Sequence, residues 1–128
     1  NFKRRYARPR PSQLHPALMP PIDPPKHAAF PSGHSTQAHL TAHILKHLMP
    51  DMVRHHYGAW DAGSQSRPEI ERDPLFDMAE RIARNREVMG LHYVSDSVAG
   101  EKLAKALYDT MVGWDVLSGI WAEAAKEW

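Results

Sequence analysis

The chain has 128 residues, and its 16 Lys and Arg residues nearly balance its 15 Asp and Glu residues. This length suits a single domain spanning residues 1–128, and the net charge of +1 gives no reason to expect nucleic acid as a partner. The absence of cysteine excludes disulfides, zinc–thiolate sites and thiol nucleophiles. It fits a cytoplasmic as well as a periplasmic protein, so the compartment is not determined, with a periplasmic or secreted location slightly preferred.

The apolar spacing predicts an all-α fold that begins with a short helix over Phe2–Arg8. Prolines crowd the next segment, Pro11–Pro31, which we expect to be extended and loop-like. A loop of this length in a compact domain is usually functional. The following helix covers Ser35–Met49, where apolar residues recur at helical spacing, and Pro50 ends it.

Glycine, serine and charged residues fill Gly58–Pro74, which predicts a surface loop or a lid. Further helices are expected over Leu75–Met89, with Gly90 as its stop signal, over Tyr93–Val112 and over Asp115–Trp128. No apolar run is long enough for a membrane span. The last of these helices is only weakly apolar on one side, through Leu117, Ile120, Trp121 and Ala124. On the other long helices the residues that we expect to face inward are Ala38, Ala42, Leu45, Met49, Phe76, Ala79, Ile82, Ala83, Val88, Val98, Leu103, Leu107 and Met111.

Three blocks of residues have the chemistry to bind and process an oxyanion. Lysine and arginine hold oxyanions as fixed charges, and a Ser-Gly-His turn that opens a helix offers a hydroxyl and backbone N–H groups to the same anion. Two histidines can supply a nucleophile and a proton. The blocks are Lys3 with Arg10-Pro11, then Pro31-Ser32-Gly33-His34, then Arg86 with His92 and Asp96. Together they predict a pocket for a tetrahedral or trigonal-bipyramidal oxyanion.

Asp96 follows His92 by four residues, so the two side chains share one face of a helix. The carboxylate can then accept the Nδ1 proton of His92 and leave Nε2 unprotonated. An isolated pair of this kind is usually a surface pair, but Arg86 and Gly90 at their offsets favour a functional interpretation. The arrangement is the one by which a catalytic triad orients its base.

The order and spacing of the three blocks resemble the signature of the type 2 phosphatidic acid phosphatase superfamily, which includes the bacterial acid phosphatases and the vanadium-dependent haloperoxidases. The resemblance extends from Lys3 to Gly100, although the stretch between the second and third blocks matches only in length. One position departs from the pattern, because Asn85 stands where the family carries a serine before the arginine. An asparagine there can still hydrogen-bond an oxygen or orient Arg86. The resemblance implies a helical bundle of the acid phosphatase and haloperoxidase type.

The resemblance further implies a metal-independent phosphatase that hydrolyses small phosphomonoesters and requires no cofactor. In this function His92 attacks phosphorus to form a phosphohistidine, His34 acts as general acid and base, and Asp96 orients His92. The residues that would hold the phosphate oxygens are Lys3, Arg10, Ser32, Gly33 and Arg86.

The same resemblance leaves a second enzyme class open, a haloperoxidase that uses bound vanadate to oxidise halide with hydrogen peroxide. His92 would then be the axial ligand of vanadium. His27 lies five residues before Ser32, where similar bromoperoxidases carry a histidine near the cofactor, but a histidine in a proline-rich loop is more often incidental and we prefer the phosphatase. A third possibility is a non-catalytic module that binds phosphate or a lipid headgroup. The presence of His34, His92 and Asp96 argues against it, because binding needs only the cations.

Other polar residues receive simpler interpretations. Three histidines recur every four residues, a spacing that a zinc site can use, but no glutamate accompanies them and we expect them to form a solvated helix face: His39, His43 and His47. The remaining basic residues near the start of the chain are also expected to be solvated, namely Arg4, Arg5 and Arg8.

Lys3 lies close to the first residue of the sequence, where a catalytic side chain would be poorly held. We therefore expect an incomplete fragment, the C-terminal catalytic part of the domain, which packs against a preceding segment or another chain, with a homo-oligomer as one form. The contact should involve Phe2–Arg8 and Trp114–Trp128 and should leave large apolar side chains exposed on the chain taken alone.

Overall fold

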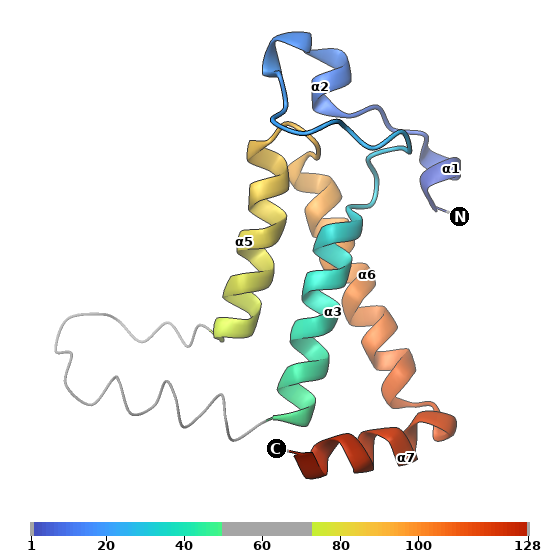
Figure 1. Cartoon of the computed structure of the whole chain (residues 1–128). Helices are drawn as coiled ribbons and strands as arrows, with labels where there is room; N and C mark the ends of the chain where they lie inside the picture. Colours follow the sequence, from blue (N-terminus) through green and yellow to red (C-terminus); the bar gives the residue numbers. More distant parts are fainter. Residues whose placement is uncertain (1, 50–72, 128) are drawn as a thin grey trace, which may run out of the picture.

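The computed structural model of the protein describes residues 2–49 and 73–127, and all regular structure in these two ranges is helical (Figure 1). The expected all-α class is therefore confirmed for this part of the chain. In chain order the elements are α1 (Phe2–Tyr6), α2 (Pro11–Leu14), the 3₁₀ helix η1 (Pro16–Leu18), α3 (Gly33–Leu48), α5 (Pro74–Val88), α6 (Val94–Val112), α7 (Asp115–Ala124) and the 3₁₀ helix η3 (Ala125–Glu127).

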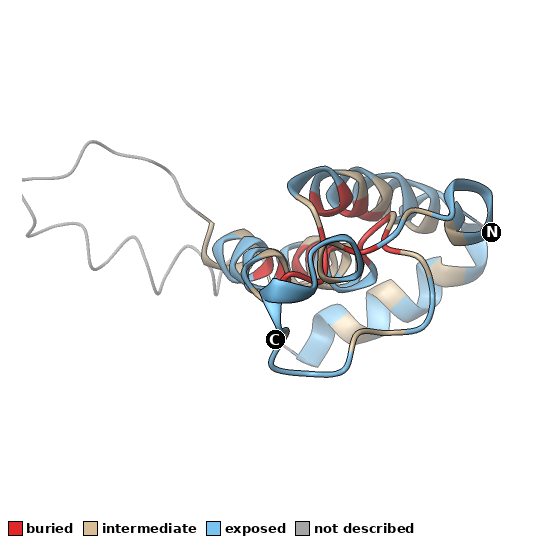
Figure 2. Cartoon of the chain, turned by 90° about the horizontal axis from the view of Figure 1, so that it is seen from above, coloured by how far each residue is buried: buried red, intermediate tan, exposed pale blue. Residues whose placement is uncertain are grey.

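Helix α3 packs closely against both α5 and α6, whereas α5 and α6 meet each other much less (Figure 1). Helix α7 lies crosswise beyond the far ends of α3 and α6 (Figure 1). Figure 2 shows the buried residues on the sides of the long helices that face one another. The buried apolar residues are mostly alanines, which allow close helix packing: Ala29, Ala42, Ala79, Ala83, Leu91 and Ala104.

Side-chain caps fix where two of the long helices begin. Ser32 caps α3, and its Oγ accepts the Ser35 N–H at 3.3 Å, so this helix begins two residues before its predicted start. Asp73 caps α5 through a 3.0 Å bond from the Leu75 N–H, with Pro74 at the first helical position. The helix starts needed correction, because the apolar pattern begins after the caps. The first helix, predicted over Phe2–Arg8, also ends early at Tyr6, because Ala7 adopts a positive φ of 43°.

The proline-rich segment is wound more tightly than predicted. Helix α2 and the 3₁₀ turn η1 each begin at a proline, whose fixed φ suits the first position of a helix. The expectation of an extended segment throughout Pro11–Pro31 is therefore wrong. Of the predicted loop Gly58–Pro74, residues 58–72 lie outside the described residues, and Pro74 belongs to α5.

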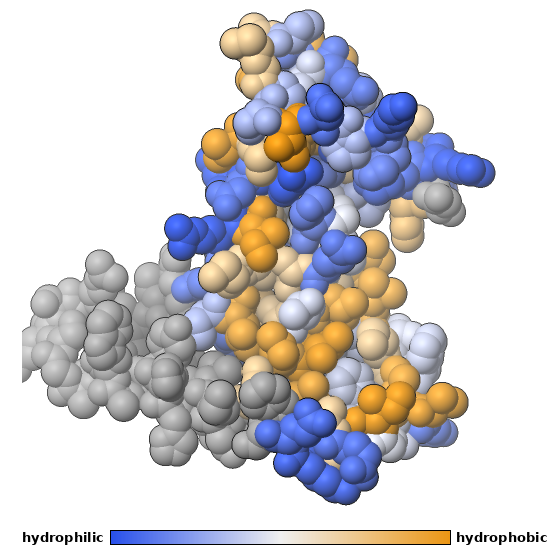
Figure 3. All heavy atoms as spheres, viewed as in Figure 1, coloured by the Kyte–Doolittle hydropathy of each residue, from blue (hydrophilic) through white to orange (hydrophobic). Residues whose placement is uncertain are grey.

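Several apolar residues that were expected to face inward are exposed. Ala42, Ala79 and Ala83 are buried as predicted, but Val88 is 75% exposed, so the prediction is wrong there. It is also wrong for three further residues that are exposed, namely Ile82, Val98 and Leu107. Large apolar side chains are exposed in both regions where we expected them, at Phe2 and Tyr6 and at Trp114, Val116 and Ile120. Figure 3 shows apolar residues gathered over the lower part of α3 and α6 and over the start of α7.

Among the described residues, no helix combines the length and the apolar character that crossing a bilayer requires.

Candidate active site

The N-terminus of α3 is fixed against the first turns of α6. The Ser32 N–H donates to the Asp96 carbonyl at 3.0 Å, and the Ser35 hydroxyl donates to the Ser97 carbonyl at 2.7 Å. Gly100 allows this approach, because a Cβ there would lie 2.6 Å from the Ser32 carbonyl oxygen. These contacts hold the predicted second and third blocks side by side.

The end of α5 turns the chain so that Arg86 and His92 reach the same region. Gly90 adopts φ +69°, and the Leu91 N–H donates back to the Arg86 carbonyl at 3.1 Å, which is the bond of a Schellman motif. The Gly90 carbonyl in turn accepts from the Ser12 N–H at 3.0 Å, which fixes the start of α2 above this turn. Leu91 and His92 are buried immediately after it.

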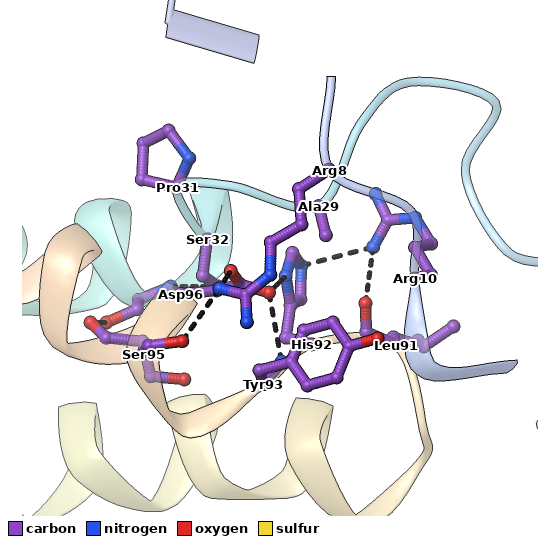
Figure 4. Close-up of polar contacts among 12 residues, drawn as sticks. Arg8, Arg10, Ala29, Pro31, Ser32, Leu91, His92, Tyr93, Ser95 and Asp96 are labelled. Atoms are coloured by element: carbon purple, nitrogen blue, oxygen red, sulfur yellow. Dashed lines mark hydrogen bonds and ion pairs between the residues drawn. The ribbon is translucent and has the colours of Figure 1, made fainter. Parts of the chain in front are cut away.

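His92 and Asp96 face one another, as the spacing predicted (Figure 4). His92 is 4% exposed, and its Nδ1 lies 3.4 Å from Asp96 Oδ2, which also accepts the Tyr93 N–H at 2.9 Å. Burial by itself would raise the pKa of Asp96, but the groups that donate to this carboxylate outweigh burial and lower the pKa. Burial lowers the pKa of His92, and Asp96 offsets part of that effect.

Arg10 determines which nitrogen of His92 carries the proton. Its Nη1 lies 3.3 Å from His92 Nε2, and because a guanidinium can only donate, Nε2 must be the unprotonated nitrogen. The hydrogen therefore resides on Nδ1, which faces Asp96. This is the tautomer that a nucleophilic Nε2 requires.

Each nitrogen of the Arg10 guanidinium donates to a backbone carbonyl, although the side chain is fully buried. Nε donates to the Pro25 carbonyl at 3.2 Å, Nη1 to the Leu91 carbonyl at 2.8 Å, and Nη2 to the His27 carbonyl at 3.1 Å. Nη2 also lies 3.3 Å from His27 Nδ1, so His27 contacts Arg10, while its place near a bound cofactor stays a prediction. An oxyanion that binds Arg10 must therefore replace some of these contacts.

Arg86 differs from Arg10 because one of its buried N–H donors makes no hydrogen bond to a described residue. Its side chain is buried, and its Nε has no hydrogen-bond partner among the described residues. Burial lowers the pKa of Arg86, and burial together with the charge of Arg86 lowers the pKa of Arg10. Two desolvated cations within electrostatic range of each other favour an anion between them.

His34 lies on the exposed first turn of α3. Partial burial lowers its pKa, and the charges of Arg86 and His92 lower it further, so His34 lies within electrostatic range of both. No described atom lies within 4 Å of the position that a Cβ on Gly33 would take, so the space in front of this turn is open. Ser32 accepts a hydrogen bond as the helix cap, which leaves its own hydroxyl hydrogen able to donate.

Lys3 lies on α1, within electrostatic range of the other cations. Burial lowers its pKa, and so does the charge of Arg10. Its Nζ donates to the carbonyls of Ala28 at 2.9 Å and Pro31 at 3.0 Å, and it lies 3.4 Å from the carbonyl of Ala29. In this structure Lys3 therefore braces the segment that leads into Ser32, while its contact with an anion stays a prediction.

Arg8 is the functional candidate that the sequence reasoning missed. We expected it to be solvated, but its Nη1 donates to Asp96 Oδ1 at 2.8 Å and to Ser95 Oγ at 2.7 Å (Figure 4). The available signal was its spacing, because residues two apart in an extended segment, such as Arg8 and Arg10, point to the same side. Asn85, by contrast, is exposed and its side chain makes no hydrogen bond to a described residue.

The predicted solvated face of histidines on α3 is wrong for His39 and His43, whereas His47 is exposed as predicted. His39 is buried, with its Nδ1 2.8 Å from the Ser35 carbonyl. The His43 ring stacks on Tyr108 at a centroid distance of 5.0 Å, and His47 Nδ1 lies 3.0 Å from the Tyr108 hydroxyl. The reason is that α3 has neighbours on two sides, so this face is covered by α6.

No protein-family model matches the chain, and no curated protein matches its sequence.

Proposed function

We propose that the protein is a phosphomonoester hydrolase that forms a phosphohistidine on His92. The observation that carries the proposal is the setting of this side chain. Asp96 lies at Nδ1 and Arg10 faces an unprotonated Nε2. Arg86, whose Nε has no partner among the described residues, and His92 both lie within electrostatic range of His34 at the start of α3. Phosphoryl transfer depends mainly on positioning the nucleophile and stabilising charge, and both requirements are supported here.

Binding of the phosphate group comes first. The dianion takes hydrogen bonds from Arg86 and from the backbone N–H groups at the start of α3, where the helix dipole favours negative charge. Arg10 exchanges its contact with His92 Nε2 for a phosphate oxygen, which uncovers the lone pair of that nitrogen. The anion also offsets the charges that lower the pKa of His34, so that His34 holds a proton when substrate is bound.

The chemistry then proceeds in two displacements. His92 Nε2 attacks phosphorus, the bond from phosphorus to the alcohol oxygen breaks, and His34 gives its proton to that oxygen. Asp96 stabilises the positive charge that develops on the imidazole of His92. In the second step His34 takes a proton from water, the water oxygen attacks phosphorus, and the bond to Nε2 breaks to release inorganic phosphate.

The experiment is a search for the intermediate together with the activity. Aryl phosphate hydrolysis is measured, and a quenched reaction is examined by mass spectrometry for an acid-labile phosphate on His92. His92→Ala should abolish both signals, whereas His15→Ala should retain them, because His15 is exposed and its side chain makes no hydrogen bond to a described residue. Undiminished turnover in His92→Ala would refute the nucleophile assignment.

A second candidate, vanadium-dependent halide oxidation, is favoured by the contact between His27 and Arg10. The spare Nε of Arg86 and the open space before Gly33 suit vanadate as well as phosphate, since both are tetrahedral oxyanions. Arg10, Arg86 and His92 would hold it, and bound vanadate supplies the activation of peroxide for halide oxidation. Peroxide-dependent halide oxidation after vanadate loading, at a rate that exceeds phosphate ester hydrolysis, would favour this candidate.

A further inference from the structure

Arg8 connects the N-terminal segment to the first turn of α6. The chain leaves α1 at Ala7, which has φ 43°, and Arg8 then extends toward α6. Its Nη1 donates both to Asp96 Oδ1 at 2.8 Å and to Ser95 Oγ at 2.7 Å. Its guanidinium carbon lies 4.1 Å from the centroid of the Tyr93 ring, a cation–π distance. Figure 4 shows these partners around one carboxylate.

The two oxygens of Asp96 have different partners, and Arg8 is the only full charge among them in the described structure. Oδ1 accepts from Arg8, while Oδ2 accepts the Tyr93 N–H and faces His92 Nδ1. The carboxylate is fully buried, and a buried charge needs a compensating partner. Arg8 therefore fixes both the ionised state of Asp96 and which of its oxygens is directed at His92.

We propose that Arg8 is a positioning residue that acts on His92 through Asp96. It holds Oδ1 so that Oδ2 faces His92 Nδ1 at 3.4 Å. Its positive charge also weakens the attraction of the carboxylate for the protonated imidazole of His92. The role in catalysis rests on the proposed function, in which His92 must be neutral to attack. The coupling of Arg8 to the His92 titration rests on the geometry alone.

Several charged groups act on His92, and Arg8 must be distinguished from them. They are Lys3 from α1, Arg10 from the segment before α2, His34 from α3 and Asp96 from α6, and Arg86 from α5 acts on both Arg10 and His34. Within the described part of the chain, the polar and ring contacts of the Arg8 side chain are with Asp96, Ser95 and Tyr93. Its effect on His92 should therefore disappear when Asp96 carries no charge.

Loss of the Arg8 charge has a definite sign. The uncompensated Asp96 carboxylate attracts the imidazolium form of His92 more strongly, so His92 should titrate at higher pH and the acidic limb of kcat/KM should move the same way. A merely structural Arg8 would behave differently, because its loss would lower the stability, or lower kcat at all pH values, without moving the titration. The direction of the titration thus separates the two roles.

The experiment compares Arg8→Gln and Arg8→Lys with Arg5→Ala. Glutamine removes the charge and keeps an amide NH₂ donor on a shorter side chain, whereas lysine restores the charge. Arg5 is an exposed arginine of the same segment that makes no hydrogen bond or ion pair to a described side chain. The His92 titration is followed by NMR of its imidazole nitrogens, beside kcat/KM against pH. We expect Arg8→Gln to raise the pH at which His92 titrates and to lower kcat/KM roughly 10- to 100-fold. Arg8→Lys should reverse most of both changes, and Arg5→Ala should alter neither the His92 titration nor kcat/KM.

Two further measurements complete the test. In an Asp96→Asn background, Arg8→Gln should no longer move the titration of His92, and an undiminished shift there would overturn the proposal. An unmoved titration in folded Arg8→Gln would overturn it as well. If Arg8→Gln does not fold, the His92 titration is compared instead in Arg8→Ala and in the Arg8→Gln, Asp96→Asn double variant. The NMR titration needs no turnover, so it still tests the coupling of Arg8 to His92 if the phosphatase assay alone fails.

Discussion

Gly100→Ala should damage the site although Gly100 itself is not one of the residues proposed to bind the substrate. Gly100 lies where α6 crosses the start of α3, and an added Cβ would lie 2.6 Å from the Ser32 carbonyl oxygen and 2.8 Å from Ser35 Cβ. Both atoms belong to the backbone or its first carbon, so neither can rotate away. The two helices must separate to accept the methyl group.

The size of the effect follows from the overlap. Ordinary contact begins at 3.4 Å, so the N-terminus of α3 must move away from α6 by about 0.8 Å. Overpacking of this kind costs about 1–3 kcal/mol, which for a chain of this size lowers the Tm by roughly 5–10 °C. A displacement of about 1 Å between reacting groups can cost 10²-fold in rate, so we expect kcat/KM to fall by roughly 10- to 100-fold.

The assay pairs thermal unfolding with aryl phosphate hydrolysis in Gly100→Ala and in Gly119→Ala. Gly119 lies in α7 with no described atom within 4 Å of an added Cβ, so alanine there should stabilise the helix by about 0.5–1 kcal/mol and leave activity unchanged. Full activity in Gly100→Ala, at a Tm equal to that of the unsubstituted protein, would show that the α3–α6 crossing does not set the geometry of the site.

Four further predictions concern the site itself. His34→Ala should reduce kcat by about 10²–10⁴ for alkyl esters and less for nitrophenyl esters, and a loss independent of the leaving group would exclude His34 as the acid. Arg86→Ala should weaken inhibition by inorganic phosphate roughly 10- to 100-fold, the effect of a lost charged hydrogen bond; an unchanged inhibition constant would remove Arg86 from the site. Gly33→Ala should weaken the same inhibition while the Tm stays constant or rises, because its Cβ meets no described atom within 4 Å. Burial lowers the pKa of His92 in the folded protein, so on acidification His92 is protonated in the unfolded chain before it is protonated in the folded one. The free energy of unfolding should therefore fall as the pH drops below 6.5, and it should stop falling once His92 is protonated in the folded protein as well. His92→Gln should flatten that part of the stability curve in denaturant titrations.

The sequence contained enough information to predict the helices but not how they contact one another. Apolar periodicity found the long helices, since each repeats its pattern over several turns. It failed at their starts, where polar caps such as Ser32 precede the apolar residues. It also failed for the histidines of α3, because the face that looks polar in sequence is covered by α6 through Tyr108.

The residues of the site were predictable where chemistry restricts the residue type. Oxyanion binding needs cations, and a nucleophilic imidazole needs a partner at its other nitrogen, so Arg86, His92 and Asp96 could be selected from spacing. Arg8 and Gly100 could not be selected in this way. Arg8 acts through its contact with Asp96 and Gly100 through its close approach to Ser32, and each contact joins residues that are far apart in the sequence. A long-range ion pair and a close helix crossing leave no periodic signal.

The two sides of the His92 ring face opposite charges, and this asymmetry links the geometry of the free protein to the proposed reaction. Asp96 lies at the Nδ1 side, with part of its charge offset by Arg8, and Arg10 lies on the Nε2 side, within electrostatic range of Arg86. In the free protein this field holds the proton on Nδ1 and leaves the lone pair on Nε2. During transfer the imidazole becomes positive, which Asp96 favours, while the phosphoryl oxygens remain next to the arginines. The arrangement that selects the tautomer therefore also stabilises the charge distribution of the transition state, and it requires no rearrangement of the carboxylate during the reaction.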